Sequence, residues 1–395
     1  MPACPYRALP ISRLGYAERG EEYAMHSPHW FEHLDQVRRF QGNTLDRFGL
    51  GPRTSPFEVI ATRPGMRVRC YGIGAADKAP LLIVPAPIKQ PYIWDISPER
   101  SVVRHALDEG LSVFMVEWIE PTAETCALGL ADYAGSMLYD CCDLIAAHTS
   151  HDQVFLTGHS LGGIFAAIFS AYRPDRVAAL ALIDAPLDFD GRDKGLRDAA
   201  EHDQPLSASG TVPGSLLSML SAHSSPQTYF LNRYADYVAS MGSREHITTH
   251  YRVARWTMDE QPMARKLFDD VINELYRHNR FMRGELDIGG KALGAGDITA
   301  PLVSVFEPAS TINPRASAEA FYAAVGSEDK QMLAYPGDVG VALQHVGPLV
   351  GDNAFLHIWP QIFAWFASVG HADDEVMHTR AVHEEARQAE GRPHS

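Results

Sequence analysis

Ser160 has the sequence surroundings that most clearly favour chemistry, because it lies within GHSLG at residues 158–162. These letters fit the G-x-S-x-G pattern, in which a sharp turn between a strand and a helix exposes a nucleophilic serine. The apolar run 154–156 precedes the pattern and a helical pattern over 163–172 follows it, so the required context is present. An ordinary glycine turn is the alternative interpretation. We predict that Ser160 attacks a carbonyl carbon and becomes acylated.

The same turn predicts an oxyanion hole, a pair of N–H groups that stabilises the negative charge on the attacked carbonyl. The N–H of Leu161, at the start of the helix, is expected to provide one half. The other half is expected from residues 85–89, PAPIK, which follow the apolar run 81–84. The two prolines there have no N–H, so Ala86 or Ile88 must donate, and we favour Ile88.

A nucleophilic serine needs a general base, and triads with this turn run along the chain in the order serine, acid, histidine. His345, His357 and His371 all lie downstream of the last apolar run. His345 lies in a loop before a predicted helix, whereas His357 falls inside the predicted helix 353–366, where a surface or packing role is commoner. We therefore predict that His345 is the general base.

Two carboxylates compete for the place of the triad acid. After the apolar run 302–306, Ser310 stands where an aspartate is expected, and Glu307 is the nearest carboxylate. Asp184 directly follows the apolar run 178–183, and a triad is defined by geometry rather than by chain position. We predict Asp184 as the acid, with Glu307 as the alternative. A helix-capping or loop carboxylate is the competing interpretation of Asp184.

The elements that must position these residues follow from a repeated pattern, in which short apolar runs alternate with helical patterns. Such alternation is typical of βαβ units. It predicts the α/β class and the α/β-hydrolase fold, a mostly parallel sheet with helices on both faces. Residues 190–296 contain helical segments and no buried strand. They are predicted to form a helical cap over the carboxyl edge of the sheet, where the active sites of open α/β sheets lie.

The predicted domain organisation has four parts. Residues 1–55 form an N-terminal helical segment, 56–189 and 297–369 form the core, 190–296 form the cap, and 370–395 form a flexible tail. Hydrophobic residues make up 46% of the 395, which is enough for one large core with a subdomain.

Composition and charge exclude several classes of function. The formal net charge of −15 argues against nucleic-acid binding, because no basic cluster could neutralise phosphates. The five cysteines are scattered, without metal-ligand spacing, and favour reduced thiols in the cytoplasm. No run is long enough to cross a bilayer, and no signal peptide is visible. We predict a cytoplasmic protein with no cofactor, no metal and no membrane insertion.

Several stretches carry a resemblance to a known family. The chain resembles the polyhydroxyalkanoate synthases, particularly the shorter class III catalytic subunits, over about residues 75–365. The stretches that carry this resemblance are residues 91–96, 99–103, 108–111, 117–118, 185–189, 255–259, 279–282 and 288–290. The resemblance implies an α/β-hydrolase fold, places the family's histidine on His345, and leaves self-association or a partner subunit open.

Two departures from the family bear on the chemistry. The resemblance implies a cysteine nucleophile where this chain has Ser160, and an acid where it has Ser310. Residues 337–344 look like a small insertion before His345. A seryl oxoester is less activated toward a hydroxyl acceptor than a thioester is, so the exchange favours hydrolysis or one-step acyl transfer over polymerisation.

The sequence therefore predicts a serine hydrolase of carboxylic esters or acyl thioesters, including hydroxyacyl thioesters. The alternative is a synthase-like acyltransferase that uses serine in place of cysteine. A binding protein with a decayed site is a third interpretation, motivated by Ser310. The expected partner is a small acyl ester or thioester.

Overall fold

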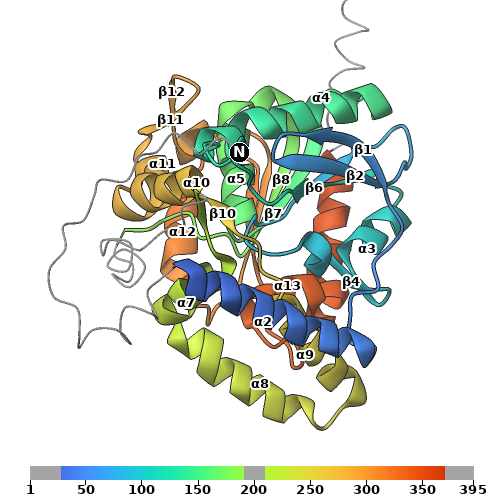
Figure 1. Ribbon diagram of the computed structural model, residues 1–395. Coiled ribbons are helices and arrows are strands. Elements are labelled where there is room, and N and C mark those ends of the chain that lie inside the picture. The colour runs from blue at the N-terminus through green and yellow to red at the C-terminus, as the bar shows by residue number, and fades with distance from the viewer. Residues whose placement is uncertain (1–27, 191–209, 370–395) are drawn as a thin grey trace, which may run out of the picture.

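The computed structural model describes residues 28–190 and 210–369 (Figure 1). The predicted tail 370–395, residues 1–27 of the N-terminal segment and residues 191–209 of the predicted cap lie outside the described residues.

An eight-stranded sheet with the order β1-β2-β6-β3-β7-β8-β13-β14 forms the centre of the molecule. The six strands from β6 to β14 are parallel, and β1 and β2 pair antiparallel at one edge. The strands are β1 (Glu58–Arg63), β2 (Met66–Gly72), β3 (Leu81–Val84), β6 (Val113–Trp118), β7 (Val154–His159), β8 (Val177–Ile183), β13 (Leu302–Phe306) and β14 (Lys330–Ala334). The α/β-hydrolase fold predicted from the alternating pattern is confirmed.

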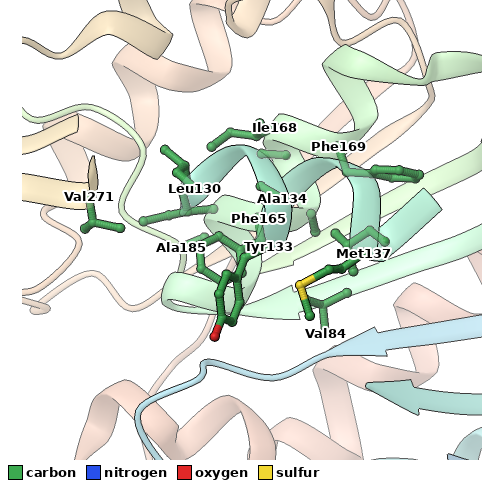
Figure 2. Packing of buried hydrophobic residues seen from close by; sticks show 14 of the residues in the cluster. Val84, Leu130, Tyr133, Ala134, Met137, Phe165, Ile168, Phe169, Ala185 and Val271 are labelled. Carbon is green, nitrogen blue, oxygen red and sulfur yellow. The ribbon is translucent and has the colours of Figure 1, made fainter. Parts of the chain in front are cut away.

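Helices cover both faces of the sheet. Each strand contributes side chains to both faces, because neighbouring side chains of a strand point in opposite directions. On one face Leu82 and Val84 of β3 pack with the helix α5 (Leu161–Tyr172), which contains Phe165 and Phe169. Figure 2 shows the side chains on this face gathered over Val84. On the other face Leu81 and Ile83 pack with α3 (Val102–Asp108) and with the helical residues 352–369. A strand buried on both faces needs a continuous apolar run, and LLIV of β3 is such a run.

The helices around the sheet include those predicted over 163–172 and 353–366. They are α3 (Val102–Asp108), the π-helical η2 (Asp132–Ser136) with α4 (Met137–Thr149), α5 (Leu161–Tyr172), α12 (Arg315–Ala324), the 3-10 turn η7 (Gln344–Val346), α13 (Gly347–Val350) and the π-helical η8 (Ala354–Ile358).

The region predicted as a cap is mainly helical, as Figure 1 shows beside and below the sheet. Its helices are α7 (Gly214–Ser224), η4 (Gln227–Asn232), α8 (Arg233–Ser240), α9 (Arg244–Thr257), α10 (Arg265–Asp270), η5 (Val271–Arg277) and α11 (Arg280–Arg283). The prediction that it contains no buried strand is wrong. Buried residues occur in the short pair β9 (Thr211–Val212) and β10 (Met263–Ala264), and in the hairpin of β11 (Leu286–Ile288) and β12 (Lys291–Leu293). Strands of two or three residues are too short to show a periodic pattern.

The N-terminal helix α2 (Pro28–Arg47) packs against the helices of the cap region. The N–H of Ser215 in α7 donates to Asp35 Oδ1 at 2.7 Å, and Arg38 donates to the carbonyl of Thr257 at 2.8 Å. Figure 1 shows α2 running alongside α7 and α9. The four-part division of the chain, including cap and core boundaries, stays our proposal.

Within residues 28–190 and 210–369, no helix has the length and apolar character that crossing a membrane requires.

Candidate active site

Ser160 lies at the turn between β7 and α5, at the carboxyl edge of the sheet. Its backbone φ is 55° and its ψ is −128°, a strained conformation for a residue with a side chain. The turn is tight because Gly162 lies against the carbonyl oxygen of Val84 in β3, where a Cβ atom would collide. The sequence places a glycine at that point, and the close approach of α5 to β3 therefore depends on it.

His345 and Asp184 come together across 161 residues of chain. Asp184 follows β8 and is completely buried, and His345 lies in η7. His345 Nδ1 is 2.7 Å from Asp184 Oδ2. A carboxylate can only accept here, so Nδ1 carries the proton and Nε2 is left as the basic nitrogen. A carboxylate in contact with Nδ1 can also stabilise the imidazolium that forms when Nε2 takes a proton.

Glu307, the alternative acid, lies at the end of β13 with a different partner. Its Oε1 accepts the N–H of Ala309 at 2.9 Å. Burial raises the pKa of the Glu307 carboxyl, and the neighbouring Asp184 acts in the same direction, while the N–H of Ala309 opposes them. The geometry thus favours Asp184 over Glu307 as the partner of His345, and the catalytic role of either carboxylate stays a prediction.

His159 was not among the predicted site residues, although it stands directly before Ser160. Its Nε2 donates to the backbone carbonyl of His345 at 2.8 Å, and the two rings lie 4.5 Å apart. Burial holds the pKa of His159 well below its usual range, and the neighbouring His345 lowers it further. A neutral imidazole can donate this bond, so His159 ties the loop of the predicted base to the turn of the predicted nucleophile. Its place inside GHSLG was the available signal.

The predicted oxyanion-hole residues lie on two sides of Ser160. Leu161 is the first residue of α5, so its N–H has no acceptor within the helix. Ala86 and Ile88 follow β3, and both line a cavity that contains Ser160. The carbonyl of Ile88 accepts the N–H of Gln261 at 3.2 Å, which joins this loop to the cap region. The choice between the N–H groups of Ala86 and Ile88 stays open.

Two cavities meet at Ser160 and His345. The larger has a volume of about 490 Å³ and a mostly apolar lining from core and cap. The smaller has a volume of about 330 Å³ and lies on the side of Lys89 and α2. The residues that line both are Ile88, Ser160, Ser221, Tyr229 and His345.

The lining of the smaller cavity is also mostly apolar, but it includes three cationic side chains. Arg38, Lys89 and Arg233 line it, and no carboxylate does among the described residues. Behind this wall the buried Glu260 lies 3.0 Å from Lys89 Nζ and 2.8 Å from Arg38 Nε. Burial lowers the pKa of Lys89 to about 8, although Glu260 opposes this shift. The negative charge of Glu260 therefore offsets only part of the positive charge of Arg38, Lys89 and Arg233.

No group of three or more histidine, cysteine, aspartate or glutamate side chains that could hold a metal ion occurs within the described residues.

The chain is similar to one family model and to several known proteins. The model of the alpha/beta hydrolase fold family matches residues 80–234. The chain is similar to "Poly(3-hydroxyalkanoate) polymerase subunit PhaC" of Allochromatium vinosum, with 28% identity over 344 residues, 85% of this chain and 95% of the relative. A relative of the same name from Haloarcula marismortui is 25% identical over 305 residues, which are 76% of this chain and 63% of that protein.

The chain is also similar to solved structures, at lower sequence identity. One is the monoacylglycerol lipase of Paleococcus ferrophilus, which has a TM-score of 0.48 and 13% identity and is matched over 74% of this chain and 96% of the lipase. The predicted resemblance to polyhydroxyalkanoate polymerases is confirmed by the similarity to the protein of Allochromatium vinosum. The role of Ser160 as the nucleophile stays a prediction.

Proposed function

We propose that this chain, an enzyme of the α/β-hydrolase fold that resembles the poly(3-hydroxyalkanoate) polymerases, transfers acyl groups through a covalent intermediate on Ser160. The observation that carries the proposal is the meeting of two cavities at Ser160 and His345. An acyl transfer with a covalent intermediate needs room for an acyl chain and, separately, for the leaving group and the acceptor. The apolar larger cavity suits the acyl chain.

The first half of the reaction forms the acyl-enzyme. Ser160 Oγ attacks the acyl carbonyl and passes its proton to His345 Nε2, while Asp184 stabilises the resulting imidazolium. The N–H of Leu161, with that of Ala86 or Ile88, stabilises the oxyanion. Collapse of the intermediate breaks the bond to the leaving group, which takes the proton from His345. The acyl group is then esterified to Ser160.

The second half regenerates the enzyme. His345 Nε2 removes a proton from the hydroxyl of an acceptor, whose oxygen attacks the seryl ester. The acyl group moves to the acceptor, and His345 returns the proton to Ser160 Oγ. We propose a hydroxyacyl thioester as the donor, on the resemblance to the polymerases, with an anionic leaving group beside the three cationic side chains of the smaller cavity.

Hydrolysis is the second candidate function, and Ser160 itself favours it. A seryl ester is less activated toward a hydroxyl acceptor than the thioester that a cysteine would form, so water competes better for it. The two functions share every step up to the acyl-enzyme. They differ only in whether a hydroxyl compound or water attacks it.

Product analysis separates the two functions. The purified protein is incubated with a 3-hydroxyacyl thioester, and the products are identified by mass spectrometry. Transfer gives esters of two or more hydroxyacyl units, hydrolysis gives the free hydroxy acid, and Ser160→Ala serves as the blank. Free acid alone would favour the hydrolase. Thioester consumption that is equal in Ser160→Ala would overturn both candidates.

A further inference from the structure

The segment between β14 and His345 is irregular in structure, and its residues 340–343 are buried. It contains the residues 337–344 that look like an insertion relative to the resembled family. Val341 and Ala342 are each only 1% exposed, and neither lies in a helix or strand. Gly340 has a φ of 91° and Ala342 a φ of 59°. An irregular buried segment needs partners for its backbone N–H groups, and this one finds them in the cap region.

Asp236 of α8 provides these partners. Its Oδ1 accepts the N–H of Gly340 at 2.8 Å, and its Oδ2 accepts the N–H of Ala342 at 2.8 Å. His250 of α9 donates from Nδ1 to the same Oδ2 at 2.6 Å. The Asp236 carboxylate therefore joins two cap helices to the loop. Asp236 is only 8% exposed. Burial alone would raise the pKa of Asp236, but these three hydrogen bonds hold it below its usual value.

The fit between the loop and α9 is tight as well. A Cβ atom on Gly340 would lie 2.8 Å from His246 Cα, which is closer than real contacts allow. The loop thus rests directly on the helix whose His250 bonds to Asp236. Its position is determined by the cap helices as well as by the sheet.

The loop leads directly to the predicted base. Leu343 N–H donates to the carbonyl of Val341 at 2.6 Å, and Val346 N–H donates to the carbonyl of Leu343 at 3.0 Å. His345 lies within this series of turns, three residues after Ala342. A displacement of Ala342 would therefore move the backbone of His345 relative to Asp184 and Ser160.

We propose that Asp236 is a positioning residue, which couples the cap helices α8 and α9 to the general base by fixing the loop before His345. The inference rests on the proposed function, because it concerns the orientation of His345. The same two helices supply Arg233 and Trp256 to the smaller cavity, so the structure that binds a ligand there also holds the base in place.

The test is Asp236→Asn, which keeps the size of the side chain but replaces one acceptor oxygen with an NH₂ donor. This donor opposes an N–H group of the loop or of His250. We expect the folded variant to react with a fluorophosphonate at Ser160 on the order of 10²-fold more slowly, since small misplacements cost about that much. On a thioester substrate kcat should fall while KM changes little.

Asp35→Asn is the matched control. Asp35 is also 8% exposed and also accepts a backbone N–H in the cap region, but its partner Ser215 does not lead to His345. Both variants should lower the Tm, whereas only Asp236→Asn should slow the labelling of the folded protein. If Asp236→Asn does not fold, Gly340→Ala displaces the loop with Asp236 intact and should slow labelling in the same way.

The outcomes separate the inference from the proposed function. Labelling of folded Asp236→Asn at the wild-type rate would overturn the positioning role, and so would equal slowing in Asp35→Asn. The proposed function would still hold after either result, provided that Ser160→Ala has lost all labelling. Labelling and turnover that survive in Ser160→Ala would instead overturn the proposed function.

Discussion

His159 stands beside the predicted nucleophile in the sequence and beside the predicted base in space. Its hydrogen bond to the carbonyl of His345 and the 2.7 Å contact between His345 and Asp184 hold the base from two sides. The partners in these two contacts are 186 and 161 positions apart in the chain. At the scale of single residues, the site thus depends on pairs that the chain brings together from distant segments.

The strongest prediction at this scale concerns the nucleophile. Ser160→Ala should abolish turnover and fluorophosphonate labelling, because the proposed acyl-enzyme forms on the hydroxyl that this change removes. The loss is about 10⁶-fold in the best-studied hydrolase. Ser170→Ala in the same helix α5 is the control, since Ser170 is buried and lines neither cavity. Near wild-type turnover in purified Ser160→Ala would show that another residue is the nucleophile.

A second prediction distinguishes the two carboxylates. Asp184→Asn should lower kcat strongly, because the asparagine cannot stabilise the imidazolium and favours the wrong tautomer of His345. The corresponding change costs about 10⁴-fold in the serine-protease example. Glu307→Gln should have a small effect, because Glu307 bonds to the N–H of Ala309. Measuring kcat for both variants decides the matter, and a large loss only in Glu307→Gln would reverse the assignment.

At the scale of elements, the approach of α5 to β3 determines where Ser160 lies. Gly162→Ala should destabilise the fold by ~1–3 kcal/mol, because the new Cβ collides with the carbonyl of Val84 and must push the helix away. Urea unfolding measures the loss. Gly242→Ala is the control, since the nearest atom to its Cβ is 3.9 Å away, and it should stay within about 0.5 kcal/mol of wild type. Equal effects of the two changes would contradict the argument from close approach.

The short strands of the cap region show what patterns miss at this scale. β9 and β10 are paired through residues 211–212 and 263–264, which are far apart in the chain. Two residues contain no period, so only the folded chain reveals the pairing. The long elements behave differently, because the apolar run LLIV of β3 determines a strand that is buried on both faces.

At the scale of the whole molecule, Lys89 joins the core to the cap region. Its Nζ donates to Ser218 Oγ at 3.1 Å and to the carbonyl of Thr257 at 2.6 Å, and it pairs with Glu260. Since burial lowers the pKa of Lys89 to about 8, the smaller cavity loses one cation as the pH rises through that value. Its attraction for an anionic leaving group should then weaken.

The resulting prediction is a pH-dependent KM. For a thioester with a phosphate-bearing leaving group, KM should rise above pH 8, by up to roughly fivefold or ~1 kcal/mol. A neutral thioester with the same acyl group is the substrate control and should show no such rise. Lys89→Arg should also remove the rise, because arginine stays protonated. A rise that persists in Lys89→Arg would assign the titration to another group.

The features of this protein that depend on local pattern could be predicted from its amino-acid sequence. Continuous apolar runs specified the parallel strands, and GHSLG specified the turn at Ser160 because strand, glycines and helix are contiguous there. The order of the elements was sufficient to predict the α/β-hydrolase fold. The choice of His345 came from chain order, whereas Asp184 was predicted from its place directly after the apolar run 178–183, and the structure places the two in contact.

Contacts between distant segments of the chain became known only from the tertiary structure. It brought Asp236 to the loop before His345 and placed His159 on the carbonyl of His345. It also joined α2 to the cap helices and placed three cationic side chains around the smaller of the two cavities at Ser160. Hydrogen bonds between residues 100 or more positions apart leave no periodic trace in a single sequence. They form only after the sheet and the helices have fixed the course of the chain.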